Sequence, residues 1–138
     1  MLIRKAGAII LSSDSSDKVG LIYRTKQKDW SFPKGHIESE ESSFEAMIRE
    51  VVEESGLKVK LLQELPDMNY VDSQGNEVLI SMYLVKSMDD NNTFGKSGDD
   101  VVEWVKIEEV SEILTYENLK KYYREILPII FSYKSVQE

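Results

Sequence analysis

The stretch that decides the fold is residues 35–57, which read GHIESEESSFEAMIREVVEESGL. From about Glu41 onward, apolar residues recur at intervals of three and four, which is typical of the buried side of an amphipathic helix. Ser42 and Ser43 lie near its start, and Gly56 lies where a left-handed residue would end it. The pattern therefore predicts a central helix, and its apolar stripe is Phe44, Met47, Ile48, Val51 and Val52.

The polar side of this helix carries three carboxylates. At about 100° per residue, Glu50, Glu53 and Glu54 fall within an arc of roughly 100°, on the side opposite the apolar stripe. Like charges at these spacings repel each other in a bare helix. Three converging carboxylates favour a hard divalent cation such as Mg²⁺ or Mn²⁺ over zinc. The alternative is a solvated acidic face, because most charge clusters on helices are no more than that.

The residues on both sides of the helix extend the pattern. Gly35 is followed after five residues by Glu41, and seven residues further on begins the run Arg49-Glu50-Val51-Val52-Glu53-Glu54-Ser55-Gly56-Leu57. This resembles the Nudix box, G-x5-E-x7-R-E-U-x-E-E-x-G-U with U apolar, and every specified position matches. A chance match in this chain is on the order of one in a million at ordinary residue frequencies. The resemblance implies a Mg²⁺-dependent pyrophosphohydrolase.

The resemblance also implies a role for each position of the box. Glu50 and Glu54 would bind the metal ion directly, and Glu53 would be a third ligand or would orient or deprotonate water. The Gly35 carbonyl often completes the metal site in this family. A pair of Glu41 and Arg49 would fix the preceding loop on the helix. The catalytic residues implied in this way are Glu53, Glu50, Glu54, Arg49 and Glu41.

The residues before the box point to a substrate class. Residues 30–36, WSFPKGH, resemble the lead-in of the diadenosine-polyphosphate hydrolase branch of Nudix enzymes. By this resemblance Lys34 would contact phosphate, and His36 would hydrogen-bond phosphate or steady the loop. Arg24 is a further candidate for phosphate, and Tyr116 for contact with a base. Each of these residues also has a structural alternative. Lys34 would then be a solvated lysine and His36 a surface histidine. Arg24 would be an exposed arginine at a strand end, and Tyr116 would pack in a helix.

Some features of this region remain open or depart from that branch. Residues 38–41 lack the proline or glycine usual before the first glutamate of the box. Many Nudix enzymes place an additional acid near the last strand, where Asp99, Asp100 and Glu103 are candidates among which the sequence does not choose. Trp30 is expected to pack in its loop rather than to stack on a base.

The rest of the chain indicates an α+β fold. We expect strands at residues 3–11, 18–24, 57–65, 67–72, 77–86 and 101–107, with turns at 30–35 and 73–76. We expect helices at 108–114 and 116–131, and Pro128 should kink or end the second one. This order predicts one Nudix domain over residues 1–138, an α/β/α sandwich with a mixed sheet, a central catalytic helix and a C-terminal helix. The apolar stripe expected in the core of the last helix is Leu119, Tyr122, Tyr123, Ile126 and Ile130.

Composition limits the partners and the location. The formal charge of −8 argues against a large nucleic-acid footprint but allows a small anionic substrate when a cation lies between it and the protein. The absence of cysteine excludes a disulfide framework and a thiolate metal site. No apolar run approaches the ~20 residues of a membrane span. We therefore expect a cytoplasmic protein with no secretory signal.

Two classes of function fit these observations. In the first, the protein is an enzyme, and the best substrate is diadenosine tetraphosphate, cut to ATP and AMP. Within that class, the alternatives are a nucleoside triphosphate pyrophosphatase acting on oxidised or noncanonical nucleotides, and an enzyme acting on capped or triphosphorylated RNA ends. In the second class, the protein is a non-catalytic Nudix module that binds a nucleotide. The number of metal ions and the oligomeric state stay open.

Overall fold

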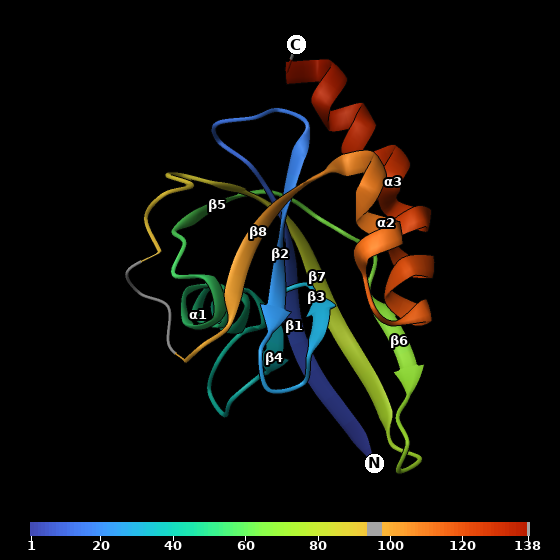
Figure 1. Cartoon of the computed structure of the whole chain (residues 1–138). Helices are drawn as coiled ribbons and strands as arrows, with labels where there is room; N and C mark the ends of the chain where they lie inside the picture. The colour runs from blue at the N-terminus through green and yellow to red at the C-terminus, as the bar shows by residue number, and fades with distance from the viewer. Residues whose placement is uncertain (94–97, 138) are drawn as a thin grey trace.

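Two long strands form the centre of the sheet. The computed structural model describes residues 1–93 and 98–137. In it, β1 (Leu2–Leu11) and β7 (Glu77–Ser87) run parallel along their whole length, from Leu2 opposite Glu77 to Leu11 opposite Lys86 (Figure 1). Residues 6–11 of β1 and 82–85 of β7 are buried, as expected for strands that are covered on both faces.

Within the described residues, the remaining strands complete one mixed, eight-stranded sheet. Next to β1 lie β2 (Lys18–Arg24) and β4 (Lys34–His36), and next to β2 lie β3 (Asp29–Ser31) and β8 (Val101–Lys106). Next to β7 lie β5 (Val59–Glu64) and β6 (Met68–Val71). The turn expected at residues 30–35 is shorter than predicted, because β3 and β4 form on either side of Phe32 and Pro33. The expected turn at 73–76 is confirmed by the antiparallel β6–β7 pair and by Gly75, whose φ is 82°.

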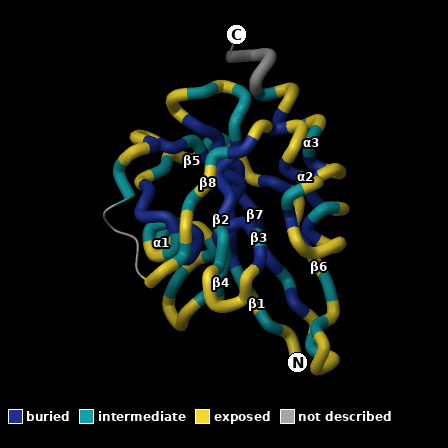
Figure 2. Tube along the Cα trace, viewed as in Figure 1, coloured by how far each residue is buried: buried dark blue, intermediate teal, exposed yellow. Residues whose placement is uncertain are grey.

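Helices cover both faces of the sheet, which confirms the predicted α/β/α sandwich. On one face lies α1 (Ser43–Ser55); on the other lie a short 3-10 helix η1 (Ile107–Glu109), α2 (Val110–Ile113) and α3 (Glu117–Gln137). Successive residues of β1 alternate between two cores, since Ala8 and Ile10 pack with α1 while Ile9 and Leu11 pack with the helices opposite. Figure 2 shows the resulting buried centre between two exposed outer layers.

The last helix differs from the sequence prediction at its end. Pro128 does not end it, since α3 continues to Gln137. Proline removes one N–H from the helix, but Ile126 and Ile130 on either side of it are buried against the sheet. Their burial offsets the missing hydrogen bond. The predicted core stripe of α3 is buried at all five positions, namely Leu119, Tyr122, Tyr123, Ile126 and Ile130. In the described part of the chain, no helix has both the length and the apolar composition of a membrane span.

Candidate active site

Helix α1 is fixed at both ends, which holds its polar side in one place. At its start Ser42 and Glu45 form a capping box, each side chain accepting a hydrogen bond from the other residue's backbone N–H. At its end Gly56 adopts the left-handed conformation, with φ of 76°, as predicted. A side chain at this position would also collide with the backbone of Thr93. Position 56 therefore requires glycine for two reasons, its left-handed backbone conformation and the lack of space for a side chain.

Arg49 joins the loop before α1 to the helix itself. Its Nε donates to Glu41 Oε2 at 2.7 Å and its Nη2 to Glu41 Oε1 at 3.0 Å, so the predicted Arg49–Glu41 pair is present. Nη2 also donates to the carbonyl of His36 at 2.9 Å, and Nη1 to Glu50 Oε1 at 2.7 Å. The guanidinium holds the pKa of Glu41 below its usual range. One side chain thus sets the position of the loop relative to Glu50.

This geometry predicts the effect of Arg49→Ala. The loop loses its tie to α1, so we expect about a tenfold fall in kcat/KM together with a lower melting temperature. The control is Arg124→Ala, which removes an exposed arginine of α3 and should change neither quantity. Unchanged activity and unchanged melting temperature in the Arg49 variant would contradict the positioning role.

Glu50 lies directly against the α-carbon of Gly35. Its side chain is largely buried and is held by Arg49. A β-carbon at Gly35 would overlap the carboxyl carbon and both oxygens of Glu50. Gly35 is therefore needed because of this close approach. The pairing of Gly35 with Ala6, in the β4–β1 ladder, fixes its position.

Glu54 has a different partner from Glu50. Its Oε2 accepts a hydrogen bond from the backbone N–H of Lys34 at 2.7 Å. Burial, together with the nearby charge of Glu50, raises the pKa of Glu54 to about 8, although the hydrogen bond from the Lys34 N–H acts in the opposite direction. Burial also lowers the pKa of Lys34 to about 8. The Lys34 ammonium donates to Ser31 Oγ at 2.6 Å.

The three box carboxylates are thus divided between two sets of partners. Glu50 and Glu53 both contact Arg49, and the Glu53 side chain is 48% exposed. Glu54 is held by Lys34 instead. Within residues 1–93 and 98–137, no three acidic or histidine side chains form a group ready to surround an ion. The expected convergence of all three carboxylates is therefore not formed in this conformation, because like charges repel and each takes a nearby donor.

The donor set nevertheless suits a hard divalent cation. The candidate ligands are the carboxylates of Glu50, Glu53 and Glu54 and the carbonyl of Gly35, all of them oxygen donors. Mg²⁺ and Mn²⁺ prefer oxygen ligands. The charge of Glu50 is also close enough to raise the pKa of Glu54, and a bound cation would relieve this repulsion. The residues present therefore fit the ion that the sequence pattern implies.

A pocket of about 250 Å³ opens beside Glu54. Three of the predicted substrate residues, Lys34, Arg24 and Tyr116, line it. His36 does not line it; its side chain is exposed, and the contact it makes with Arg49 uses its backbone carbonyl. The residues that line the pocket are Lys5, Arg24, Ser31, Phe32, Lys34, Glu54, Tyr70, Tyr116, Asn118 and Leu119.

Among the pocket residues to which the sequence analysis gave no role in the site are Lys5 and Tyr70. Lys5 comes from β1 and lies opposite His36 in the β1–β4 ladder, and Tyr70 comes from β6. Neither stands in a recognisable motif, so only the pairing of strands could have found them. Together with Arg24 and Lys34, Lys5 gives the pocket three cationic side chains in a chain of net charge −8.

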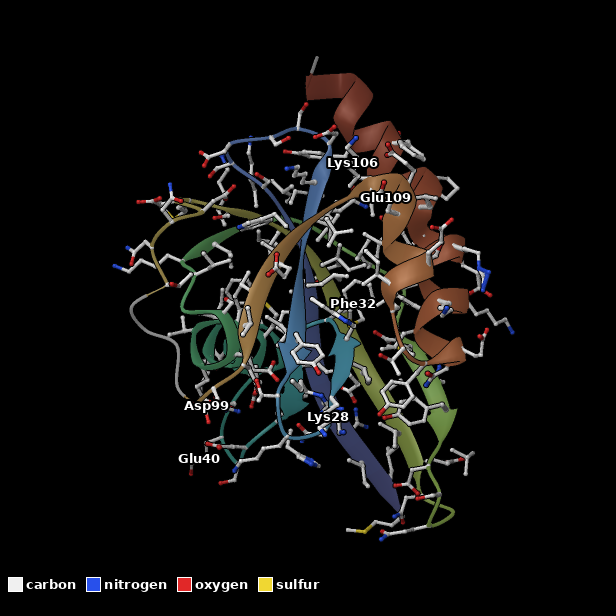
Figure 3. All side chains as sticks on the ribbon, viewed as in Figure 1. Lys28, Phe32, Glu40, Asp99, Lys106 and Glu109 are labelled. Atoms are coloured by element: carbon white, nitrogen blue, oxygen red, sulfur yellow. The ribbon has the colours of Figure 1, made fainter. Side chains whose placement is uncertain are left out.

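The acids expected near the last strand, Asp99, Asp100 and Glu103, do not line this pocket. The Asp99 carbonyl accepts from Thr25 Oγ1 at 2.7 Å, Asp100 Oδ1 accepts from the Thr25 N–H at 3.3 Å, and Glu103 is exposed on β8. Figure 3 places Asp99 at the start of β8. A part for one of these acids at the metal site stays a prediction. Trp30 packs against Tyr23 with ring centroids 4.9 Å apart, so the expected packing role is confirmed.

Known proteins share this sequence pattern and this fold. The profile of the NUDIX domain matches residues 1–128. The mRNA-decapping enzyme subunit 2 of Saccharomyces cerevisiae is 27% identical over 119 residues, which are 84% of this chain and 12% of the yeast protein. The putative mutator protein MutT4 of Mycobacterium tuberculosis is 30% identical over 111 residues, 75% of this chain and 43% of that protein. The chain thus spans less than half of the length of these relatives.

Solved structures agree with the fold. The Ap4A hydrolase of C. elegans, in a binary complex, superposes with a TM-score of 0.72. The alignment covers 94% of this chain and 98% of that one, at 19% sequence identity. At this identity the likeness concerns the fold, including the mixed sheet between two helical layers.

Proposed function

The chain belongs to the NUDIX domain family, and on that premise we propose that it hydrolyses a phosphoanhydride bond in a nucleotide. One observation carries the proposal. Glu54, a carboxylate of the box helix, lines the same pocket as the cations Lys5, Arg24 and Lys34. A polyphosphate held by these cations would therefore lie beside the carboxylates that suit a divalent ion.

The side chains around the pocket would have different roles in such a reaction. When bound, Mg²⁺ supplies charge neutralisation at the phosphates and a more acidic attacking water. Glu50 and Glu54 would hold the ion, with the Gly35 carbonyl and Glu53 completing the set or Glu53 orienting the water. Arg49 and Glu41 would hold the loop before α1 in a fixed position relative to these ligands. Lys34 would stabilise charge that develops on the leaving phosphate.

The substrate that fits best is diadenosine tetraphosphate, cut asymmetrically to ATP and AMP. Its long anionic bridge matches the three cations of the pocket, and the pocket also contains the rings of Tyr70 and Tyr116. Tyr116 is 45% exposed, so its ring is accessible to a base rather than packed in the core. The structural relative named as an Ap4A hydrolase, and the WSFPKGH lead-in, favour the same substrate.

Three other functions remain as alternatives. A nucleoside triphosphate pyrophosphatase acting on oxidised or noncanonical nucleotides is favoured by the likeness to a putative mutator protein. Action on RNA ends is favoured by the likeness to an mRNA-decapping enzyme subunit, although the charge of −8 makes a large RNA footprint unfavourable. A non-catalytic binding module is disfavoured because Glu50, Glu53 and Glu54 are all present. A single domain and a cytoplasmic location stay predictions.

A panel of substrates tests the proposal. We expect kcat/KM for diadenosine tetraphosphate to exceed that for dGTP, an oxidised dGTP and ADP-ribose at one Mg²⁺ concentration, with no hydrolysis in EDTA. Lys34→Ala should lower kcat/KM for the dinucleotide about tenfold or more by removing a phosphate contact. Lys58→Ala, at an exposed lysine outside the pocket, is the control and should leave activity unchanged.

Each result separates one alternative from the others. A mononucleotide that is cut ten times faster would overturn the dinucleotide assignment and leave the hydrolase assignment in place. Binding of nucleotides without any hydrolysis in Mg²⁺ or Mn²⁺ would favour the non-catalytic module. A wild-type activity that survives EDTA would contradict the metal requirement.

A further inference from the structure

A buried aspartate lies behind the wall of the pocket and is itself no part of its lining. Asp29, in the edge strand β3, has a side chain that is only 2% exposed. Its two oxygens accept hydrogen bonds from Arg24, from Nε at 2.7 Å and from Nη2 at 2.6 Å. One of these oxygens also accepts from the Tyr116 hydroxyl at 2.6 Å. A single carboxylate therefore holds two side chains that line the pocket.

The backbone next to Asp29 reinforces this arrangement. The Trp30 N–H donates to Thr115 Oγ1 at 2.8 Å, and the Thr115 N–H donates to the Trp30 carbonyl at 3.3 Å. The segment before α3 is thus docked on the edge of β3 directly beside Tyr116. Strand and segment are far apart in sequence, and these hydrogen bonds join them.

The chemistry of the cluster favours an ionised Asp29. A buried carboxylate is costly unless several donors satisfy it, and here three donor groups do so. The paired Arg24 holds the pKa of Asp29 below its usual range, and Asp29 in turn raises the pKa of Tyr116. Arg24 gives the Nε hydrogen and one Nη2 hydrogen to Asp29, which leaves both hydrogens of Nη1 and the second of Nη2 for a phosphate oxygen.

We propose that Asp29 is a positioning residue, which holds the Arg24 guanidinium and the Tyr116 ring at the pocket wall and so sets the affinity for the nucleotide. The proposal rests on the function proposed above, because Arg24 and Tyr116 are its substrate contacts. Asp29 does not line the pocket, and its side-chain hydrogen bonds go to Arg24 and Tyr116 rather than to a carboxylate of α1. Its loss should therefore weaken binding and leave the chemical step almost unchanged.

The first test is Asp29→Asn, assayed with diadenosine tetraphosphate. The amide keeps the shape but loses the charge and offers one acceptor in place of two. We expect KM to rise about tenfold, the scale of lost hydrogen bonds to a charged group, with kcat within about threefold of wild type. Binding of ATP, measured by calorimetry with Ca²⁺ in place of Mg²⁺, should weaken by a similar factor.

A matched control separates positioning from general destabilisation. Asp90 is also buried, at 8% exposed, and accepts hydrogen bonds from the N–H and hydroxyl of Ser13, both at 2.9 Å. These contacts hold the loop after β1, and Asp90 does not line the pocket. Asp90→Asn should lower the melting temperature while KM and ATP affinity stay at wild-type values.

A second variant covers the case in which Asp29→Asn does not fold. Tyr116→Phe keeps a ring that can stack but loses the hydroxyl that Asp29 holds. We expect about a threefold to fivefold rise in KM from this variant alone. In the Asp29→Asn background the same change should add less than twofold, because the interaction has already been lost.

The outcomes are distinguishable. A KM within twofold of wild type in Asp29→Asn, or a fall in kcat at unchanged KM, would overturn the positioning role. So would an unchanged KM in Tyr116→Phe, should the first variant not fold. If the wild type binds ATP but cuts no nucleotide, the proposed hydrolase function fails, and the ATP affinities still decide the role of Asp29. A wild type that neither binds nor cuts would overturn both proposals.

Discussion

Glu53→Gln and Glu54→Gln are each expected to lower turnover by at least ~10²-fold while the fold survives. An amide carries no charge and cannot take a proton from water, so each variant loses a ligand or a base in the proposed site. The hydrogen bond that Glu54 accepts from the Lys34 N–H can be kept by the amide oxygen, since that bond uses a single acceptor. The measurement is kcat at saturating Mg²⁺ for the best substrate of the panel.

The stability of Glu54→Gln gives an independent check in EDTA. Because burial raises the folded-state pKa of Glu54 to about 8, the unfolded chain releases this proton at lower pH than the folded protein does. Stability is therefore lost as pH rises from about 4 to about 8. Glutamine removes this loss. We expect the melting temperature of the variant to equal that of wild type near pH 4 and to exceed it progressively up to pH 8.

The same helix offers a matched control. Glu45 belongs to the capping box of α1, a role that glutamine also fulfils. Glu45→Gln should leave both kcat and stability almost unchanged. Near-normal turnover in Glu53→Gln or Glu54→Gln would show that metal chemistry does not belong to that carboxylate.

Gly35→Ala is expected to lower kcat by about 10²-fold with only a small loss of stability. The added methyl group would occupy the place of the Glu50 carboxylate. That carboxylate is the end of a flexible side chain, so it can move away at little cost to the fold. Moving it, however, displaces a proposed metal ligand and breaks its contact with Arg49 at 2.7 Å.

Gly75→Ala is the control, because it changes a glycine that is needed for backbone conformation but lies outside the proposed site. Its φ is 82°, and a β-carbon there meets no other atom within 4 Å. The variant should therefore lose stability by about 1–2 kcal/mol from backbone strain and keep full activity. Full activity in Gly35→Ala would contradict the proposed place of Glu50 in the site.

The proposed catalytic segment could be predicted because it is continuous in sequence. The spacing of apolar residues indicates α1, Gly56 ends it, and the pairing of Arg49 with Glu41 follows from the box pattern. Local sequence determines these features, since the residues involved are separated by one or two helical turns or by a short loop.

The pocket could be predicted only in part, because distant strands build it. Lys5, Tyr70 and Asp29 belong to three different strands and carry no motif that links them to Glu54. Their meeting depends on strand order, which the periodicity of a single strand does not reveal. The turn at 30–35 was predicted too long for the same reason, since β3 and β4 exist through pairing with β2 and β1. The behaviour of Pro128 likewise depends on tertiary packing.

The parallel pairing of β1 with β7 has a consequence for synthesis on the ribosome. Of these two strands β1 is synthesised before β7, so the centre of the sheet cannot form until β7 is available to pair with it. Contacts so distant in sequence are slow to form, because a long loop has to be ordered before they contribute. Until then Ile9 and Ile10, which are fully buried in the finished fold, lack their final partner. The nascent chain therefore presents an apolar strand without its β7 partner until residues 77–87 have been synthesised and have left the ribosome, and exposed apolar strands of this kind favour aggregation.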